Sequence, residues 1–390
     1  MEVFFSIIIP FYNAENFLKK TILSISNQKR KNIEIILVDD CSSDRSREIY
    51  QKLKTKYSYI KIIKNKKNSG VGKSRNKGVH KSKGKYIVFL DSDDHLFPKS
   101  LEKLEYLIKG SSYPDTIILK HKKSTYPKSN EQLISNVNFK IKKPEKLIKY
   151  LNKNKVPFAD CWFIAVKRNL ILKNKISFPN TRFGESEYFV SKTICFTKNY
   201  ECLDENFYFK NDRLASLNSS DGYDATISVI ENLIEFCEFL KQKKLSLIKR
   251  KLVTRYIKDG FGLLYALIIL QKSSELIRVS KFLQKKLKTI KKIKIPKKKY
   301  NFFLSINKYG ILKAQKLLIK NIEDEKNKQI GKIKKIKNIY IYCKSKYAAA
   351  TILILKKNRL KLKGIIDDSY ISRKERFLGH EVINPDFFFR

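Results

Sequence analysis

The amino-acid sequence predicts an α/β protein built on a mostly parallel sheet. Strand and helix patterns alternate through residues 1–110, the strands are short apolar runs, and polar residues follow each of them. Such alternation places helices on both faces of a parallel sheet. With 390 residues, 42% of them hydrophobic, the chain is long enough for two or three domains.

The first two strand–helix pairs occupy the N-terminal part of this pattern. Residues 4–9 form an apolar run that a proline ends, and residues 33–38 form a β-branched run bounded by acids. Between them, residues 14–27 carry apolar side chains at helical spacing. Ser43 stands where a capping residue would begin a helix over 43–57.

The next two pairs continue the alternation. A third strand is expected at 60–63, and the helix at 70–82 opens with a glycine. A fourth strand is expected at 86–90, and Pro98 precedes a helix that runs to Ile108. This part of the chain carries the clearest α/β pattern.

Beyond residue 110 the pattern is mixed and then almost entirely helical. We expect strands at 116–120, 162–166 and 207–210, and helices at 144–151, 185–196, 227–240, 252–270 and 276–287.

A further unit starts near Ile336, and its expected elements are strands at 339–343 and 362–366 around a helix at 347–357. The patterns therefore predict three parts, which are residues 1–220, 221–335 and 336–390.

The chain is strongly basic, because 84 Lys and Arg against 37 Asp and Glu give a formal charge of +47. Lysines are spread along the sequence together with many Asn and Ile residues, which genomic base bias would produce. The run 281–299 has ten lysines and no acid, which favours attraction to an anionic membrane face. Nucleic-acid binding is a third reading, but no RNP, KH, zinc-finger or clear helix-turn-helix pattern supports it.

The sequence contains no pattern typical of a membrane-spanning helix, a signal peptide or a zinc site. The apolar stretch 260–270 has about half of the roughly 20 residues that a membrane-spanning helix needs. No basic region precedes the N-terminal apolar run, so we expect no signal peptide. The six cysteines form no C-x-x-C pair, which disfavours a zinc site or disulfide framework and favours a reducing compartment. We expect a cytoplasmic protein, soluble or peripheral on the inner face of the membrane.

Polar clusters follow the predicted strands, and the carboxyl ends of parallel strands meet at one edge of a sheet. Acids at that edge repel one another, so a cation or polar ligand should lie between them. An Asp-x-Asp after a buried strand suits Mg²⁺ or Mn²⁺ held against phosphate oxygens, although a solvated turn has the same pattern. The residues at the strand ends are Tyr12-Asn13, Asp39-Asp40, Asn68-Ser69-Gly70 with Arg75, and Asp91-Ser92-Asp93-Asp94.

These segments together resemble the family-2 glycosyltransferases, which are nucleotide-sugar enzymes of the GT-A fold. The resemblance covers residues 1–220 and implies a Rossmann-like nucleotide-sugar-binding sheet, followed here by a helical region and a small C-terminal α/β module. Its motifs are SIIIPFYNAENFL (6–18), ILVDDCSSDRS (36–46), NSGVGKSRNKG (68–78), YIVFLDSDDHLFP (86–98), ISFPNTRFGESEYF (176–189) and FYFKNDRLASLNSS (207–220).

The resemblance implies a role for each matching residue. The donor would be a nucleoside-diphosphate sugar, most often a UDP-sugar, and the cofactor a divalent cation, Mn²⁺ or Mg²⁺. The implied roles are a base pocket of Pro10, Tyr12 and Glu15, a hydrogen bond to the base, most often uracil, from Asp40, a position near the nucleotide or its diphosphate for Arg75, the ribose side for Asp91 and metal ligation by Asp93.

The resemblance also implies transfer with inversion, for which a carboxylate deprotonates the acceptor hydroxyl. The family usually places this base in a Glu-Asp pair at a helix start. Here Ser186 stands where Asp is common, so we expect Glu185 to be the base, with Glu187 as the alternative. Both acids could instead only complement a helix N-terminus.

The C-terminal unit resembles a small Rossmann-like module, but Cys343–Lys346 replaces the glycine-rich turn that would approach a phosphate. A structural or docking role is therefore expected for it.

The function expected for the whole chain is sugar transfer to a glycan or lipid-linked acceptor of the bacterial surface, such as capsule or lipooligosaccharide, beside an anionic inner membrane. An oligomer is possible, and no nucleic acid is expected as a partner. A non-catalytic nucleotide-sugar-binding scaffold is the alternative, and a basic nucleic-acid-binding protein is a remote one.

Overall fold

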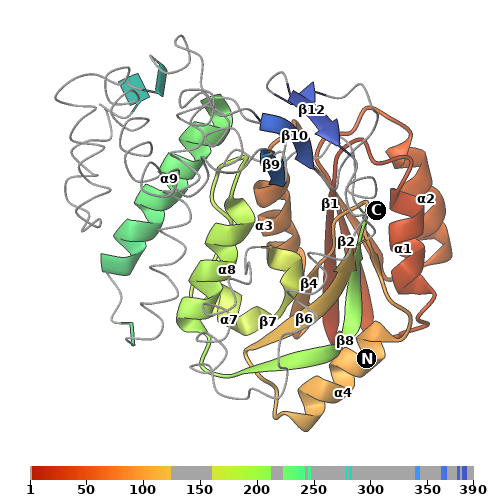
Figure 1. Ribbon diagram of the computed structural model, residues 1–390. Helices are drawn as coiled ribbons and strands as arrows, with labels where there is room; N and C mark the ends of the chain where they lie inside the picture. The colour runs from red at the N-terminus through yellow and green to blue at the C-terminus, as the bar shows by residue number, and fades with distance from the viewer. Residues whose placement is uncertain are drawn as a thin grey trace. The chain divides into compact units, whose positions relative to one another are not determined.

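In the computed structural model the chain divides into two compact units (Figure 1). The first unit contains the elements from β1 to β8, and the second contains α9 and the strands β9 to β12. The residues described are 2–123, 160–211, 223–241, 245–246, 278–279, 281–282, 339–342, 362–366, 376–377 and 380–383.

An eight-stranded sheet forms the first unit, with the strand order β3-β2-β1-β4-β7-β6-β8-β5. The four strands from β3 to β4 are parallel, as predicted. The other half is mixed, because β7 runs antiparallel to both β4 and β6 while β6 and β8 run parallel. The strands are β1 (Phe5–Phe11), β2 (Ile33–Asp39), β3 (Ile60–Lys64), β4 (Tyr86–Phe89), β5 (His95–Leu96), β6 (Thr116–Lys123), β7 (Ile164–Lys167) and β8 (Tyr200–Lys210).

The helices between the parallel strands cover both faces of the sheet (Figure 1). The helices α1 (Leu18–Ser26) and α2 (Ser46–Lys56) lie on one side, and α3 (Val71–Lys81) lies on the other. The chain therefore winds outward through β1, β2 and β3 and then crosses back to β4 on the opposite side of β1. This reversal makes the carboxyl ends of β1 and β4 a topological switch point, where open α/β sheets bind ligands.

Most element boundaries agree with the sequence patterns to within a few residues. The helix α2 begins at Ser46 rather than at Ser43, because the Asp44 carboxylate accepts hydrogen bonds from the Ser46 and Glu15 amides instead. The other helices described in the first unit are α4 (Ser100–Gly110), the 3₁₀ turn Cys161–Phe163, α7 (Arg168–Lys173) and α8 (Glu185–Phe196). The helices predicted at 144–151, 252–270 and 347–357 lie outside the described residues.

A buried carboxylate joins the amino ends of the central strands. Glu34 in β2 has a side chain that is 2% exposed, and it accepts hydrogen bonds from Ser6 Oγ at 2.6 Å and from the Gly84 amide at 3.2 Å. Burial alone would raise the pKa of Glu34, but hydrogen bonds from Lys61, Ser6 and the Lys83 amide outweigh it and lower the pKa. The turn before β4 is thereby held against β1 and β2.

The substitution Gly84→Ala is expected to lower the free energy of unfolding by about 1–3 kcal/mol, as overpacking does. A Cβ at Gly84 would lie 2.5 Å from the Ser6 nitrogen and 2.7 Å from the Phe5 carbonyl carbon, which are backbone atoms of β1 and cannot swing away. Gly110→Ala is the matched control, since its Cβ would meet nothing within 4 Å. Urea unfolding curves measure both variants, and equal midpoints would contradict the close approach.

The second unit contains one long helix and a small sheet within the described residues. The helix α9 spans Tyr223–Lys241, and the strands are β9 (Ile339–Tyr342), β10 (Leu362–Ile366), β11 (Arg376–Phe377) and β12 (His380–Ile383). The strand order is β11-β12-β10-β9, with β9, β10 and β12 parallel. None of the helices described combines the length and apolarity that a bilayer crossing requires. The division into 1–220, 221–335 and 336–390 stays a prediction.

Candidate functional site

An acidic loop, residues 91–94, follows β4 at the switch point, and β8 holds it in place. The Tyr208 hydroxyl donates a hydrogen bond to Asp94 Oδ2 and accepts one from the Asp91 amide at 3.2 Å. The Asn211 amide donates to Asp94 Oδ1 at 2.8 Å, and the Asn211 side chain donates to the Asp93 carbonyl. Residues more than a hundred positions away along the chain therefore fix the shape of the acidic loop.

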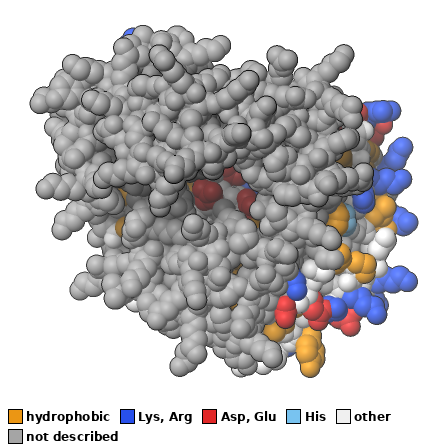
Figure 2. All heavy atoms as spheres, in the orientation of Figure 1, with side chains coloured by type: hydrophobic (Ala, Val, Ile, Leu, Met, Phe, Trp, Pro, Cys, Tyr) orange, Lys and Arg blue, Asp and Glu red, His pale blue; other side chains and the backbone are white. Residues whose placement is uncertain are grey.

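The carboxylates of the acidic loop crowd one another. Asp94 is 2% exposed, and burial followed by the negative charges of Asp91 and Asp93 raises its pKa to about 7. Such crowding is expected where a cation binds. Figure 2 shows a few acidic side chains (red) near the middle of one face, and others at its lower right, where Lys and Arg side chains (blue) also gather.

Arg75 joins the acidic loop to the start of α8. Its side chain is 5% exposed, and its Nη2 donates to Asp91 Oδ1 at 2.8 Å. Its Nη1 donates to Glu185 Oε1 at 2.9 Å and to Ser186 Oγ at 3.1 Å. The guanidinium carbon also lies 5.3 Å from the centre of the Phe178 ring. One buried cation thus brings α3, the β4 end and α8 to a common point.

Glu185 is the predicted base that lies in this cluster. Burial raises the pKa of Glu185 more than the neighbouring Arg75 lowers it, so the pKa is above its ordinary value. Gly184, with φ 72°, takes the left-handed conformation that turns the chain into α8. Glu187 lies in the same first turn, two residues further on, and therefore points in a different direction.

Asp40, the residue predicted to bind the base, is buried at the end of β2. Its Oδ1 accepts hydrogen bonds from the Ser69 amide at 2.8 Å and from Asn65 Nδ2 at 2.6 Å, and its Oδ2 accepts one from the Gly70 amide at 2.8 Å. These bonds shape the loop that opens α3 and so position Arg75. A contact between Asp40 and a base stays a prediction.

The other predicted base-pocket residues lie just after β1. Pro10 is buried within the strand, whereas Tyr12 is 50% exposed and presents its ring to solvent at the switch point. Glu15 Oε2 accepts a hydrogen bond from the Arg45 amide at 3.0 Å, which ties the β1 end to the start of α2. Tyr12 is therefore the residue of this group best placed to contact a ligand.

Three residues of β8 and its end escaped the sequence prediction as site residues. Tyr208 and Asn211 hold the acidic loop, and Lys210 lies between them in sequence. All three belong to the stretch 207–220, whose resemblance to the family was visible but whose individual roles were not. Trp162, which is 2% exposed, stacks on Tyr208 with ring centres 4.6 Å apart, so it is a core aromatic.

Among the residues that the structure describes, no group of three or more His, Cys, Asp or Glu side chains could hold a metal ion by itself. The donor set nevertheless fits a hard cation. Mg²⁺ and Mn²⁺ use one or two carboxylates together with substrate phosphates, and Asp93 belongs to a crowded set of carboxylates at the sheet edge. Metal ligation by Asp93 stays a prediction.

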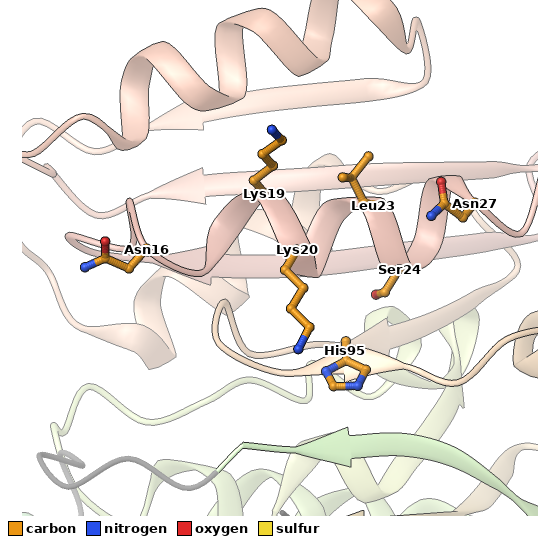
Figure 3. A pocket seen from close by; sticks show the side chains of 7 residues that line it. All are labelled: Asn16, Lys19, Lys20, Leu23, Ser24, Asn27 and His95. Carbon is orange, nitrogen blue, oxygen red and sulfur yellow. The ribbon is translucent and has the colours of Figure 1, made fainter.

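A separate hollow of about 480 Å³ lies between α1 and β5, beyond the acidic loop (Figure 3). None of the predicted site residues lines it, so it is distinct from the switch-point site. Its lining residues are Asn16, Lys19, Lys20, Leu23, Ser24, Asn27 and His95.

The parallel half of the sheet is doubly wound, the acidic loop lies at its switch point, and Arg75 joins this loop to the acidic start of α8. This combination defines the class of GT-A nucleotide-sugar transferases. Residues 1–349 of Staphylococcus aureus TarS have a TM-score of 0.61 at 19% identity, over 84% of this chain and 92% of that one, which shows the shared fold. The chain belongs to glycosyl transferase family 2, whose sequence profile matches residues 6–173.

Two curated relatives share about a third of their aligned residues with this chain. The poly(ribitol-phosphate) beta-N-acetylglucosaminyltransferase TarP of Staphylococcus aureus is 31% identical over 268 residues, which are 65% of this chain and 80% of TarP. The cholesterol galactosyltransferase of Borreliella burgdorferi is 32% identical over 229 residues, 55% of this chain and 62% of that protein. Across several relatives the chain spans only 42 to 62% of their length.

Proposed function

We propose that the protein transfers a sugar from a nucleoside-diphosphate donor, a UDP-sugar, to a hydroxyl group of a bacterial surface glycan with inversion at the anomeric carbon. The observation that carries this proposal is the Arg75 cluster. Its ion pairs bring together Asp91, which we assign to the donor side, and Glu185, which we assign to the acceptor side. Inverting transfer needs these two sides next to each other.

In this proposal the Tyr12 ring and Asp40 contact the base, and Asp91 contacts the ribose. Glu185 Oε2 takes the proton of the acceptor hydroxyl, because its Oε1 is engaged by Arg75. A divalent cation bound at Asp93 would supply positive charge against the leaving diphosphate. The buried Asp94 and Tyr208 keep the acidic loop in the conformation that presents Asp91 and Asp93.

The names of the relatives support the proposed donor and acceptor. TarS has been crystallised in complex with UDP-GlcNAc and with UDP. TarP acts on poly(ribitol phosphate), and the Bacillus subtilis relative GgaA is a minor teichoic acid biosynthesis protein. A surface polymer hydroxyl is therefore the acceptor that we propose, and the basic run 281–299 would favour work beside an anionic membrane face.

The test is transfer of radiolabelled sugar from a panel of UDP- and GDP-sugars to ribitol-phosphate polymer and to cholesterol, with Mn²⁺ and with EDTA. We expect one UDP-sugar to be used on the polymer, with EDTA abolishing transfer. If sugar were transferred to cholesterol and not to the polymer, the proposed acceptor would be wrong. If the protein transferred sugar from none of the donors, the whole proposal would be overturned.

The substitution Asp93→Asn is expected to lower the transfer rate more than about 100-fold, since even the outer partners of metal ligands contribute about 10–100-fold. Asp204→Asn is the control, because the Asp204 side chain in β8 is 67% exposed and pairs with Lys120 of β6 instead of belonging to the acidic loop. Initial rates at saturating donor and Mn²⁺ measure both variants. An Asp93→Asn enzyme as fast as wild type would remove the metal-ligand role.

A further inference from the structure

Lys210 is the last residue of β8, and its backbone is fixed against the acidic loop. The next residue, Asn211, donates hydrogen bonds from its amide to Asp94 Oδ1 and from its side chain to the Asp93 carbonyl. The Lys210 Nζ lies 5.2 Å from the centre of the Trp162 ring, and that ring is itself stacked on Tyr208. The Lys210 ammonium therefore lies over one face of a stacked aromatic pair.

Four carboxylates act electrostatically on the Lys210 ammonium. Burial alone would lower the pKa of Lys210, but the negative charges of Asp91, Asp94, Asp160 and Asp93 outweigh it and raise the pKa. The group is thus a permanent cation at neutral pH.

The ammonium nevertheless has its hydrogen-bonding capacity available. In the described part of the chain no carboxylate forms an ion pair with Nζ and no group accepts a hydrogen bond from it. Arg75, another cation at the site, has both terminal nitrogens engaged by Asp91, Glu185 and Ser186. An ammonium carries three donors. Lys210 is therefore a cation whose donors can bind an incoming anion.

We propose that Lys210 binds the diphosphate of the nucleotide-sugar donor, a role that rests on the transferase function proposed above. The acidic loop beside it is the diphosphate and ribose end of the site, whereas the base end lies at Tyr12 and Asp40. During transfer the bond from the anomeric carbon to the diphosphate oxygen breaks, and its electron pair stays on that oxygen. The acceptor oxygen bonds to the carbon and its proton goes to Glu185. Lys210 stays protonated and stabilises the leaving diphosphate.

Calorimetric titration of the full-length protein with UDP and with uridine, each with Mn²⁺ present, tests this assignment. For Lys210→Met we expect UDP to bind at least about 10-fold more weakly, because a hydrogen bond to a charged group contributes about 1.5–3 kcal/mol. Uridine affinity should be unchanged, since uridine lacks the diphosphate. Lys210→Arg, which keeps the cation, should retain most of the UDP affinity.

Lys120→Met is the matched control, because Lys120 lies on the neighbouring strand β6 and pairs with Asp204 instead. It should bind UDP as wild type does. Unchanged UDP affinity in Lys210→Met, or equal weakening of UDP and uridine, would overturn the inference while leaving the transferase proposal standing. Failure of the wild-type protein to bind either UDP or GDP would overturn both.

Discussion

The substitution Arg75→Met is expected to lower the free energy of unfolding by about 3–5 kcal/mol and to abolish transfer. Removing one partner of a buried ion pair leaves the other charge uncompensated, and losses of this size are typical. Here two acids lose their partner at once, since the Arg75 guanidinium binds both Asp91 and Glu185. Their side chains are 26% and 12% exposed, so water replaces the cation only in part.

Two further variants make this result specific. Arg45→Met removes an arginine whose side chain is 77% exposed, and exposed ion pairs contribute about 0–1 kcal/mol, so its unfolding midpoint should stay near that of wild type. Arg75→Lys keeps the charge but not the planar fork that reaches two carboxylates, so it should recover stability only in part. Urea denaturation followed by circular dichroism measures all three. Equal midpoints for Arg75→Met and Arg45→Met would show that the cluster does not stabilise the fold.

Much of the first unit could be predicted because its elements are local. The helix α8 was expected at residues 185–196 and spans Glu185–Phe196, since two acids and a preceding glycine mark its start. The four parallel strands are apolar runs whose length and ends the sequence displays directly. The strand β5 could not be predicted, because its two residues become a strand only by pairing with Tyr208 and Phe209 of β8.

The site could be predicted as a set of residues but not as a network. Arg75 was expected near the nucleotide or its diphosphate, and the structure shows it bound to Glu185, which is 110 positions away along the chain. Asp40 was expected at a base, and its carboxylate accepts backbone hydrogen bonds from a loop that no local pattern connects to it. Lys210 is one of 84 basic residues, so only its packing on Trp162 and its acidic surroundings distinguish it.

The substitution Glu185→Gln is expected to lower the rate of sugar transfer by about 10²–10⁴-fold, which is the usual contribution of a general base. UDP affinity should stay at the wild-type value, because Glu185 belongs to the acceptor side of the site. Gln keeps the size of the side chain and can still accept a hydrogen bond from Arg75, so folding is expected to be retained. Glu187→Gln is the matched control, because Glu187 lies two residues further on in the same first turn of α8. We expect this variant to transfer sugar at the wild-type rate.

The pH dependence gives a second measurement of the same role. A general base acts in its deprotonated form, and burial raises the pKa of Glu185 above the ordinary value of 4.5. The transfer rate should therefore fall as the pH decreases through this raised pKa, at a pH above that of an exposed glutamate. Glu187→Gln should keep this fall in rate at low pH, which is the acid limb of the pH profile. The residual rate of Glu185→Gln should lack the acid limb.

The two readouts together separate an enzyme from a binding scaffold. Ser186 stands where the family commonly has an acid next to Glu185, and its hydroxyl accepts a hydrogen bond from Arg75. A neutral serine hydroxyl is too weak a base to take a proton near neutral pH. If Glu185 is the base, one conservative substitution removes both the rate and the acid limb while UDP binding persists. If wild type and Glu185→Gln turn over the donor equally slowly and bind UDP equally well, the protein is a nucleotide-binding scaffold without catalysis. The natural serine at 186, in place of the family's usual acid, would then account for the lost activity.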